Sequence, residues 1–113
     1  MNYSVSEQDG VVVISLTGKI MGGPEATEIN EKFHQLIDEK KLKIIIDLNN
    51  VEWMNSSGLG ILIGAVTLLS NNQGKLRLIN VSDRIQNLLK ITKLSGIFET
   101  SDSLEAAISS FSN

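Results

Sequence analysis

The sequence predicts an α/β fold: a mainly parallel, four- to five-stranded sheet with an antiparallel N-terminal edge strand and about four helices. Short β-branched runs alternate with longer segments whose apolar residues recur at helical spacing. The resulting order is β-β-α-β-α-β-α-β-α, with spacings that suit right-handed crossovers between parallel strands. An Asp-Gly pair at residues 9–10 indicates a hairpin, which makes the first two strands antiparallel.

The first half of the chain supplies the edge hairpin, a helix and a central strand. Residues 11–17 alternate in the manner of a strand with two different faces, and residues 3–7 pair with it. A Gly-Gly-Pro break then starts a helix, with Pro24 in the first turn, where its missing N–H costs nothing. The expected core stripe of this helix is Ala26, Ile29, Phe33, Leu36 and Ile37. Residues 43–48 are nearly all apolar, as in a central strand.

The second half continues the alternation of helices and strands. The next helix is expected to end near residues 71–74 and to leave Ile61 and Leu68 outside its core face. That core face is predicted to be Leu59, Leu62, Ile63, Val66 and Leu69. Residues 75–80 alternate charged and apolar, which indicates a sheet face open to water, and the two alternating strands together favour helices concentrated on one face.

The last elements follow from capping signals. Ser82 is predicted to cap a helix carrying Ile85, Leu88 and Leu89. A short strand over residues 97–100 comes next, and Asp102, with Glu105 three residues on, is predicted to cap a final helix. That helix is expected to bury Leu104, Ala107, Ile108 and Phe111.

Composition excludes several classes of function. The 113 residues suit one domain over residues 1–113, and a net charge of −3 offers no diffuse attraction to nucleic acid or to a membrane surface. There is no cysteine for disulfides or thiolate chemistry. No signal peptide is recognisable and the apolar stretch 59–69 is too short to span a bilayer, so we expect a cytoplasmic protein.

Signals of catalysis are also missing. The single histidine, His34, has no metal-ligand spacing around it and is read as solvated helix surface. The glycines of residues 58–64 match neither a P-loop nor a dinucleotide fingerprint, and no GxSxG is present. Lys40, Lys41 and Lys43 are read as complementing a helix C-terminus. We therefore expect no enzyme, no cofactor and no metal.

The most informative stretch is the strand-to-helix turn that carries Ser56 and Ser57. A hydroxyl there lies beside free backbone N–H groups and the positive end of a helix dipole, which favours a negative charge. The simpler interpretation is that one serine is an N-cap, worth about 1 kcal/mol. Gly58, Gly60 and Gly64 indicate close approach of the helix to a neighbour.

Residues 54–60, Met-Asn-Ser-Ser-Gly-Leu-Gly, resemble the STAS domain of bacterial anti-sigma factor antagonists, which typically show Asp, Ser, Ser or Thr, then Gly-Leu-Gly. Residues 16–18, 44–48, 88–89 and 94–98 are also similar to their family counterparts. The resemblance implies phosphorylation of Ser56, with Ser57 as the alternative acceptor, by an anti-sigma factor that is also a serine kinase. It also implies a serine phosphatase that reverses the modification.

By the same resemblance, the unmodified protein binds the anti-sigma factor and the phosphorylated one does not. The expected partner-binding residues are Met54, Asn55, Ser57, Gly58, Leu59, Gly60 and Ile61. A phosphate at a helix N-terminus is compatible with the fold. Asn55 departs from the family's aspartate, and Trp53 is read as packing in the turn. One alternative is a STAS domain that is not phosphorylated and serves as an interaction subunit of a transporter or signalling assembly. Another is an enzyme, although the sequence contains no recognisable set of catalytic residues. Whether the protein self-associates is left open.

Overall fold

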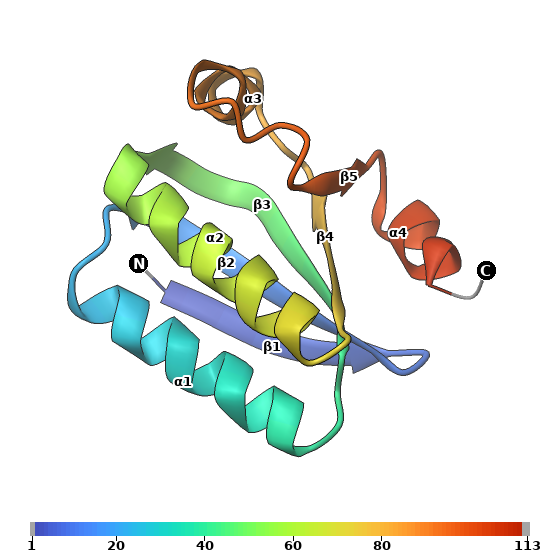
Figure 1. The fold of residues 1–113 in the computed structure, drawn as a ribbon. Helices are drawn as coiled ribbons and strands as arrows, with labels where there is room; N and C mark the ends of the chain where they lie inside the picture. The colour runs from blue at the N-terminus through green and yellow to red at the C-terminus, as the bar shows by residue number, and fades with distance from the viewer. Residues whose placement is uncertain (1, 112–113) are drawn as a thin grey trace.

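The computed structural model describes residues 2–111 and has the predicted fold class and element order (Figure 1). Five strands form one sheet in the order β1-β2-β3-β4-β5. The strands are β1 (Asn2–Gln8), β2 (Val11–Ile20), β3 (Lys43–Met54), β4 (Lys75–Ile79) and β5 (Glu99–Ser101). The helices are α1 (Pro24–Asp38), α2 (Ser56–Asn71), α3 (Asp83–Ile91) and α4 (Leu104–Ser110).

The predicted edge hairpin is confirmed. β1 pairs with β2 in antiparallel register from Asn2↔Thr17 to Gln8↔Val11, and every other neighbouring pair of strands is parallel. Asp9 and Gly10 have φ values of 55° and 79°, so both turn residues adopt the left-handed conformation that a tight hairpin needs. β1 has β2 as its single neighbour in the sheet order and is therefore an edge strand.

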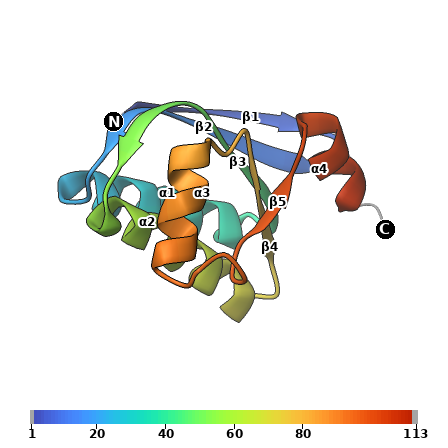
Figure 2. The same ribbon diagram turned by 90° about the horizontal axis from the view of Figure 1, so that it is seen from above.

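The helices are distributed unevenly over the two faces of the sheet, as the strand alternation predicts. The main core joins one face to α1, α2 and α3, and Figure 2 shows α1 and α2 together on one side of the strands. The short helix α4 covers part of the opposite face. Its contacts there form a second, smaller cluster: Val11, Val13, Ile45, Ile79, Ala107, Ile108 and Phe111.

α4 corrects the expectation that β4 leaves one face open to water. Arg77 lies beneath this helix with its side chain only 12% exposed. Its guanidinium pairs with Glu99 at 2.7 Å, donates to the Ser110 hydroxyl at 3.3 Å and lies 5.0 Å from the ring centre of Phe111. The charged residue Arg77 in β4 therefore connects the sheet to α4 through these contacts, which the local sequence pattern does not reveal.

Two capping predictions had different outcomes. Ser82 caps α3 as predicted, its hydroxyl accepting the N–H of Ile85 at 3.2 Å. Asp102 was the wrong residue for α4: the cap is Ser103, which accepts the N–H of Ala106 at 3.1 Å. A capping side chain must reach an N–H two or three residues on, and Asp102 lies one residue too early.

β3 is longer than the apolar run that predicts it. Pairing with β2 shifts register near Thr17 and again near Lys19, then continues to Met54. Trp53 was therefore wrongly read as packing in the turn, because it is a strand residue opposite Lys19 and is 37% exposed. The polar segment after Leu48 extends the sheet because its backbone pairs with β2.

Two surface readings have different outcomes. The last turn of α1 contains no basic residue, so the reading of Lys40, Lys41 and Lys43 as complementing that helix C-terminus is not confirmed. His34 is exposed on α1, as expected. In the basic cluster, Lys41 pairs with Glu7 at 3.0 Å and with Glu39 at 3.5 Å, and the hydrogen bond to Glu7 is the main reason why the pKa of Lys41 is raised. Among residues 2–111, no helix has both the length and the apolarity needed to cross a bilayer.

Candidate functional site

Asn55 is the only residue between β3 and α2, and it is held by three hydrogen bonds. Its side-chain oxygen accepts the N–H of Gly58 at 2.7 Å and its carbonyl accepts the N–H of Leu59 at 2.9 Å. Its own N–H donates to the carbonyl of Ile20 at 3.3 Å. Asn55, and neither serine, is thus the N-cap of α2, which corrects the interpretation of the serines as caps.

Replacing Asn55 with alanine is expected to lower the free energy of unfolding by about 1 kcal/mol, because the cap of a 16-residue helix is lost. Asn55→Asp should change the free energy of unfolding by only a few tenths of a kcal/mol, since the two side chains cap about equally well. Urea denaturation of both variants beside the parent checks this. Equal stability of the alanine variant and the parent would contradict the capping role.

Ser56 and Ser57 are the first two residues of α2, and both are exposed. Within residues 2–111 no hydrogen bond engages either hydroxyl. Helix geometry also leaves their backbone N–H groups without a carbonyl acceptor in the helix, next to the positive end of the dipole. The first turn of α2 therefore combines free hydroxyls with an environment that favours negative charge.

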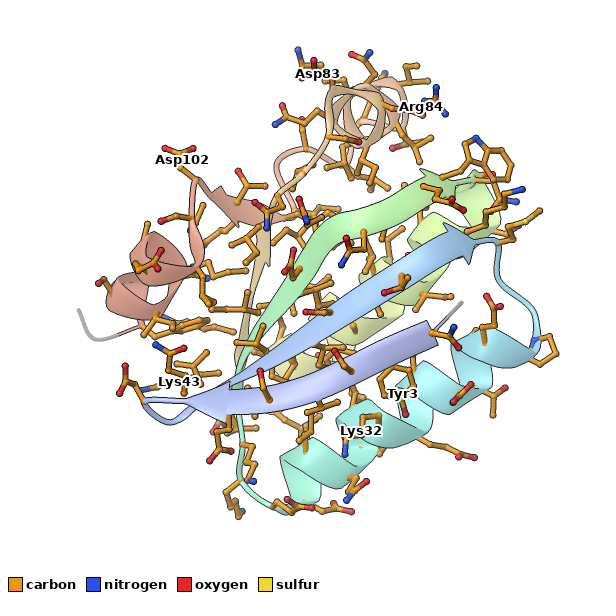
Figure 3. All side chains as sticks on the ribbon, turned by 180° about the vertical axis from the view of Figure 1, so that it is seen from behind. Tyr3, Lys32, Lys43, Asp83, Arg84 and Asp102 are labelled. Carbon is orange, nitrogen blue, oxygen red and sulfur yellow. The ribbon has the colours of Figure 1, made fainter. Side chains whose placement is uncertain are left out.

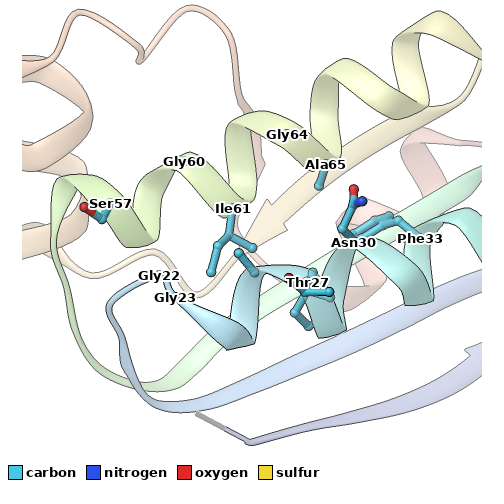
Figure 4. Close-up of a pocket in the computed structure, with 12 residues that line it drawn as sticks. Gly22, Gly23, Thr27, Asn30, Phe33, Ser57, Gly60, Ile61, Gly64 and Ala65 are labelled. Carbon is cyan, nitrogen blue, oxygen red and sulfur yellow. The ribbon is translucent and has the colours of Figure 1, made fainter.

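The two serines have different surroundings. A Cβ added to Gly22 would lie 3.2 Å from Cβ of Ser57, so this serine sits against the loop between β2 and α1. Figure 4 shows Ser57 above Gly22 at the start of α2. Ser57 also lines a groove between α1 and α2, whereas Ser56 is not among the groove residues.

This groove, of about 410 Å³, runs between α1 and α2 (Figure 4). Gly60 and Gly64 line it, and a Cβ added to either would meet no atom within 4 Å. The expectation of close approach is therefore wrong for these two glycines. It is confirmed for Gly58, where an added Cβ would lie 1.9 Å from the carbonyl oxygen of Ile20.

Several of the residues expected to bind a partner are buried. Met54, Gly58 and Leu59 face the core. Ile61 is 7% exposed, so the expectation that it lies outside the core face is wrong. α1 packs beside α2 and widens its buried face; the buried residues of α2 are Gly58, Leu59, Ile61, Leu62, Ala65 and Leu69, while Ile63 and Val66 are only partly buried.

The exposed part of the predicted set is accordingly Ser57 and Gly60, with Asn55 partly exposed beside Ser56. The capping role of Asn55 was not predicted, although an asparagine directly before the first turn of a helix is a recognisable N-cap signal. In the described part of the chain, no group of three or more His, Asp or Glu side chains is placed to hold a metal ion.

Comparison with known proteins identifies the fold family. A model of the STAS domain matches residues 2–107. The anti-sigma-B factor antagonist of Staphylococcus aureus is 29% identical over 107 residues, covering 93% of this chain and 96% of that protein. A crystal structure of an anti-sigma factor antagonist from Mycobacterium paratuberculosis has a TM-score of 0.82 at 23% identity, covering 99% of this chain and 94% of the other.

A second structure of similar fold is also matched. The Bacillus cell fate determinant SpoIIAA in its phosphorylated form has a TM-score of 0.74 at 22% identity, covering 97% of this chain and 99% of that protein. At these identities the two structures support the fold alone. The match over residues 2–107, together with the sheet order and the turn at residues 54–60, shows that this chain belongs to the STAS domain family, among relatives named anti-sigma factor antagonists.

Proposed function

We propose that this chain is a single-domain, cytoplasmic anti-sigma factor antagonist. Its unphosphorylated form binds an anti-sigma factor that is also a serine kinase, and this releases the sigma factor. Phosphorylation of Ser56 blocks the binding and a serine phosphatase restores it; the chain itself is not an enzyme. The observation that carries the proposal is the exposed hydroxyl of Ser56 at the first position of α2, free of any capping duty.

The same geometry supports the proposal that the fold tolerates a phosphate on Ser56. The cap of α2 is the side chain of Asn55, so modifying Ser56 removes no hydrogen bond that holds the helix. The added charge of about −1.5 to −2 lies at the positive end of α2, near free N–H groups. Phosphorylation therefore changes the surface presented to a partner while the helix start stays in place.

Asn55 is compatible with phosphorylation of Ser56 because its neutral side chain still caps α2. Asparagine and aspartate cap helices about equally well, so the departure from the family pattern keeps the geometry. It also removes a negative charge next to the phosphate, and a like charge at that distance would disfavour the phosphorylated form.

Ser56 is favoured over Ser57 as the acceptor because Ser57 abuts the loop at Gly22. Incubation with an anti-sigma factor kinase from the same genome and ATP should add one phosphate, measured by intact mass. Ser56→Ala should abolish the addition and Ser57→Ala should retain it. Labelling that persists in Ser56→Ala would refute the site.

The alternative is a STAS interaction subunit of a transporter or signalling assembly that binds its partner constitutively. The observation that favours this alternative is the departure of Asn55 from the aspartate that the family typically has before the phosphorylated serine. In that case Ser56→Asp would leave partner binding unchanged. In the proposed function, the same substitution weakens it.

A further inference from the structure

Five large apolar side chains are exposed in the described chain, and two of them lie near Ser56. The five are Val5, Met21, Trp53, Ile91 and Ile97. Two of them, Met21 at 48% exposure and Trp53 at 37%, lie at the same end of the sheet, where α2 begins: Met21 directly follows β2 and Trp53 is near the end of β3. Exposed apolar groups gathered at one place indicate an interaction surface more strongly than the same groups scattered singly.

The strand register places Trp53 opposite Lys19, two residues before Met21. Parallel pairing of β2 with β3 places Lys19 opposite Trp53 and Ile20 opposite Met54. Ile20 and Met54 are buried in the main core, so Lys19 and Trp53, which precede them, face the other side of the sheet. Figure 3 shows the sheet from the side opposite α1 and α2. Met21 follows Ile20 directly, at the point where the Ile20 carbonyl accepts the N–H of Asn55.

This surface lies within reach of the proposed phosphate. Trp53 is three residues before Ser56, so their Cα atoms are at most about 10 Å apart even along extended chain. Gly22, next to Met21, lies against Ser57. A protein that covers Ser56 closely enough to be displaced by a phosphate would therefore also cover Met21 and Trp53.

We propose that Met21 and Trp53 are the apolar anchors of the surface that binds the anti-sigma factor, an inference that rests on the proposed function above. The side chains of Met54, Leu59 and Ile61 are buried and cannot supply apolar contacts to a partner. Tryptophan and methionine are enriched in interface cores, which typically have a charged rim.

The charged residues around Met21 and Trp53 also indicate what kind of surface the partner must have. Lys19 and Glu52 are exposed beside the two anchors and carry opposite charges. The complementary surface of the anti-sigma factor is therefore an apolar recess for the indole and thioether, bordered by charges of both signs. A second copy of this chain would have to meet the same requirement, and the experiment below separates the two occupants.

The test measures affinity for the anti-sigma factor kinase of the same genome by titration calorimetry. Met21→Gln and Trp53→Thr should each raise the dissociation constant about tenfold or more, as truncation of an anchor does. Val5→Thr is the matched control, because it removes an equally exposed apolar group from β1, and its dissociation constant should stay within about twofold of the parent. Thermal unfolding of each variant confirms that it is folded, and Met21 lies outside every strand and helix.

The outcomes separate this inference from the proposed function. In one outcome, the parent protein binds the kinase and is phosphorylated on Ser56, but Met21→Gln and Trp53→Thr bind as tightly as Val5→Thr. This result would refute the two anchors and leave the proposed function intact. Parent protein that neither binds nor accepts phosphate would overturn the function, and the anchors with it. Loss of self-association in the two variants by sedimentation, with kinase affinity unchanged, would assign the surface to a second copy and also overturn the proposal.

Discussion

Gly58→Ala is expected to lower the free energy of unfolding by about 3 kcal/mol or more, and to leave little folded protein if the parent is only marginally stable. The added Cβ would lie 1.9 Å from the carbonyl oxygen of Ile20 and 2.6 Å from its carbonyl carbon. Both are backbone atoms of β2, so no side chain can rotate away to make room. Either α2 must move off the sheet or β2 must bend.

Gly60→Ala is the matched control in the same helix. A Cβ at Gly60 meets no atom within 4 Å, so the substitution should stabilise the protein by about 0.5–1 kcal/mol through helix propensity alone. Urea denaturation of the two variants and the parent gives both values. Similar free energies of unfolding for Gly58→Ala and Gly60→Ala would mean that the close approach to Ile20 is absent in solution.

Phosphorylation of Ser56 is expected to weaken binding to the anti-sigma factor by about two orders of magnitude, equivalent to a loss of roughly 3 kcal/mol. The modification places a strongly hydrated group with a charge of about −1.5 to −2 at the exposed start of α2, next to Ser57 and three residues after the proposed anchor Trp53. Calorimetric titration of the phosphorylated and unmodified proteins measures the difference.

A charge control distinguishes a local effect from a change in net charge. Ser109→Asp adds negative charge on the exposed side of α4, which lies away from the start of α2 (Figure 1), and should leave the dissociation constant within about twofold. Ser56→Asp should weaken binding in the same direction as the phosphate. The free energy of unfolding of the phosphorylated protein should stay within about 1 kcal/mol of the parent, because Asn55 still caps α2. Equal affinities of the phosphorylated and unmodified proteins would refute the switch.

Most of the fold could be predicted because the elements carry strong local signals. The period of two in β2 and the helical stripe of Ile29, Phe33 and Leu36 both reappear as buried faces. The Asp-Gly turn fixes the hairpin because few residue pairs adopt two successive left-handed conformations. These signals act within a few residues, so a single sequence suffices to read them.

The errors occur where distant segments meet. Ile61 is buried because α1 lies beside α2, and Arg77 is covered because α4 folds back over β4. β3 continues through a polar segment because β2 supplies hydrogen-bond partners. In each case the deciding contact comes from another element, which no pattern within the segment reports.

The sequence by itself determined the order of elements, the strand-to-helix turn and the serine that the family motif marks within it. Local backbone preference and apolar periodicity decide these features, and both are written in neighbouring residues. Only the tertiary structure decided that Gly58 must lie against the Ile20 carbonyl, that Ile61 is buried and that Met21 and Trp53 are exposed. The physical reason is that burial and exposure depend on which segments pack together, and β2 lies more than 30 residues before the turn that it completes.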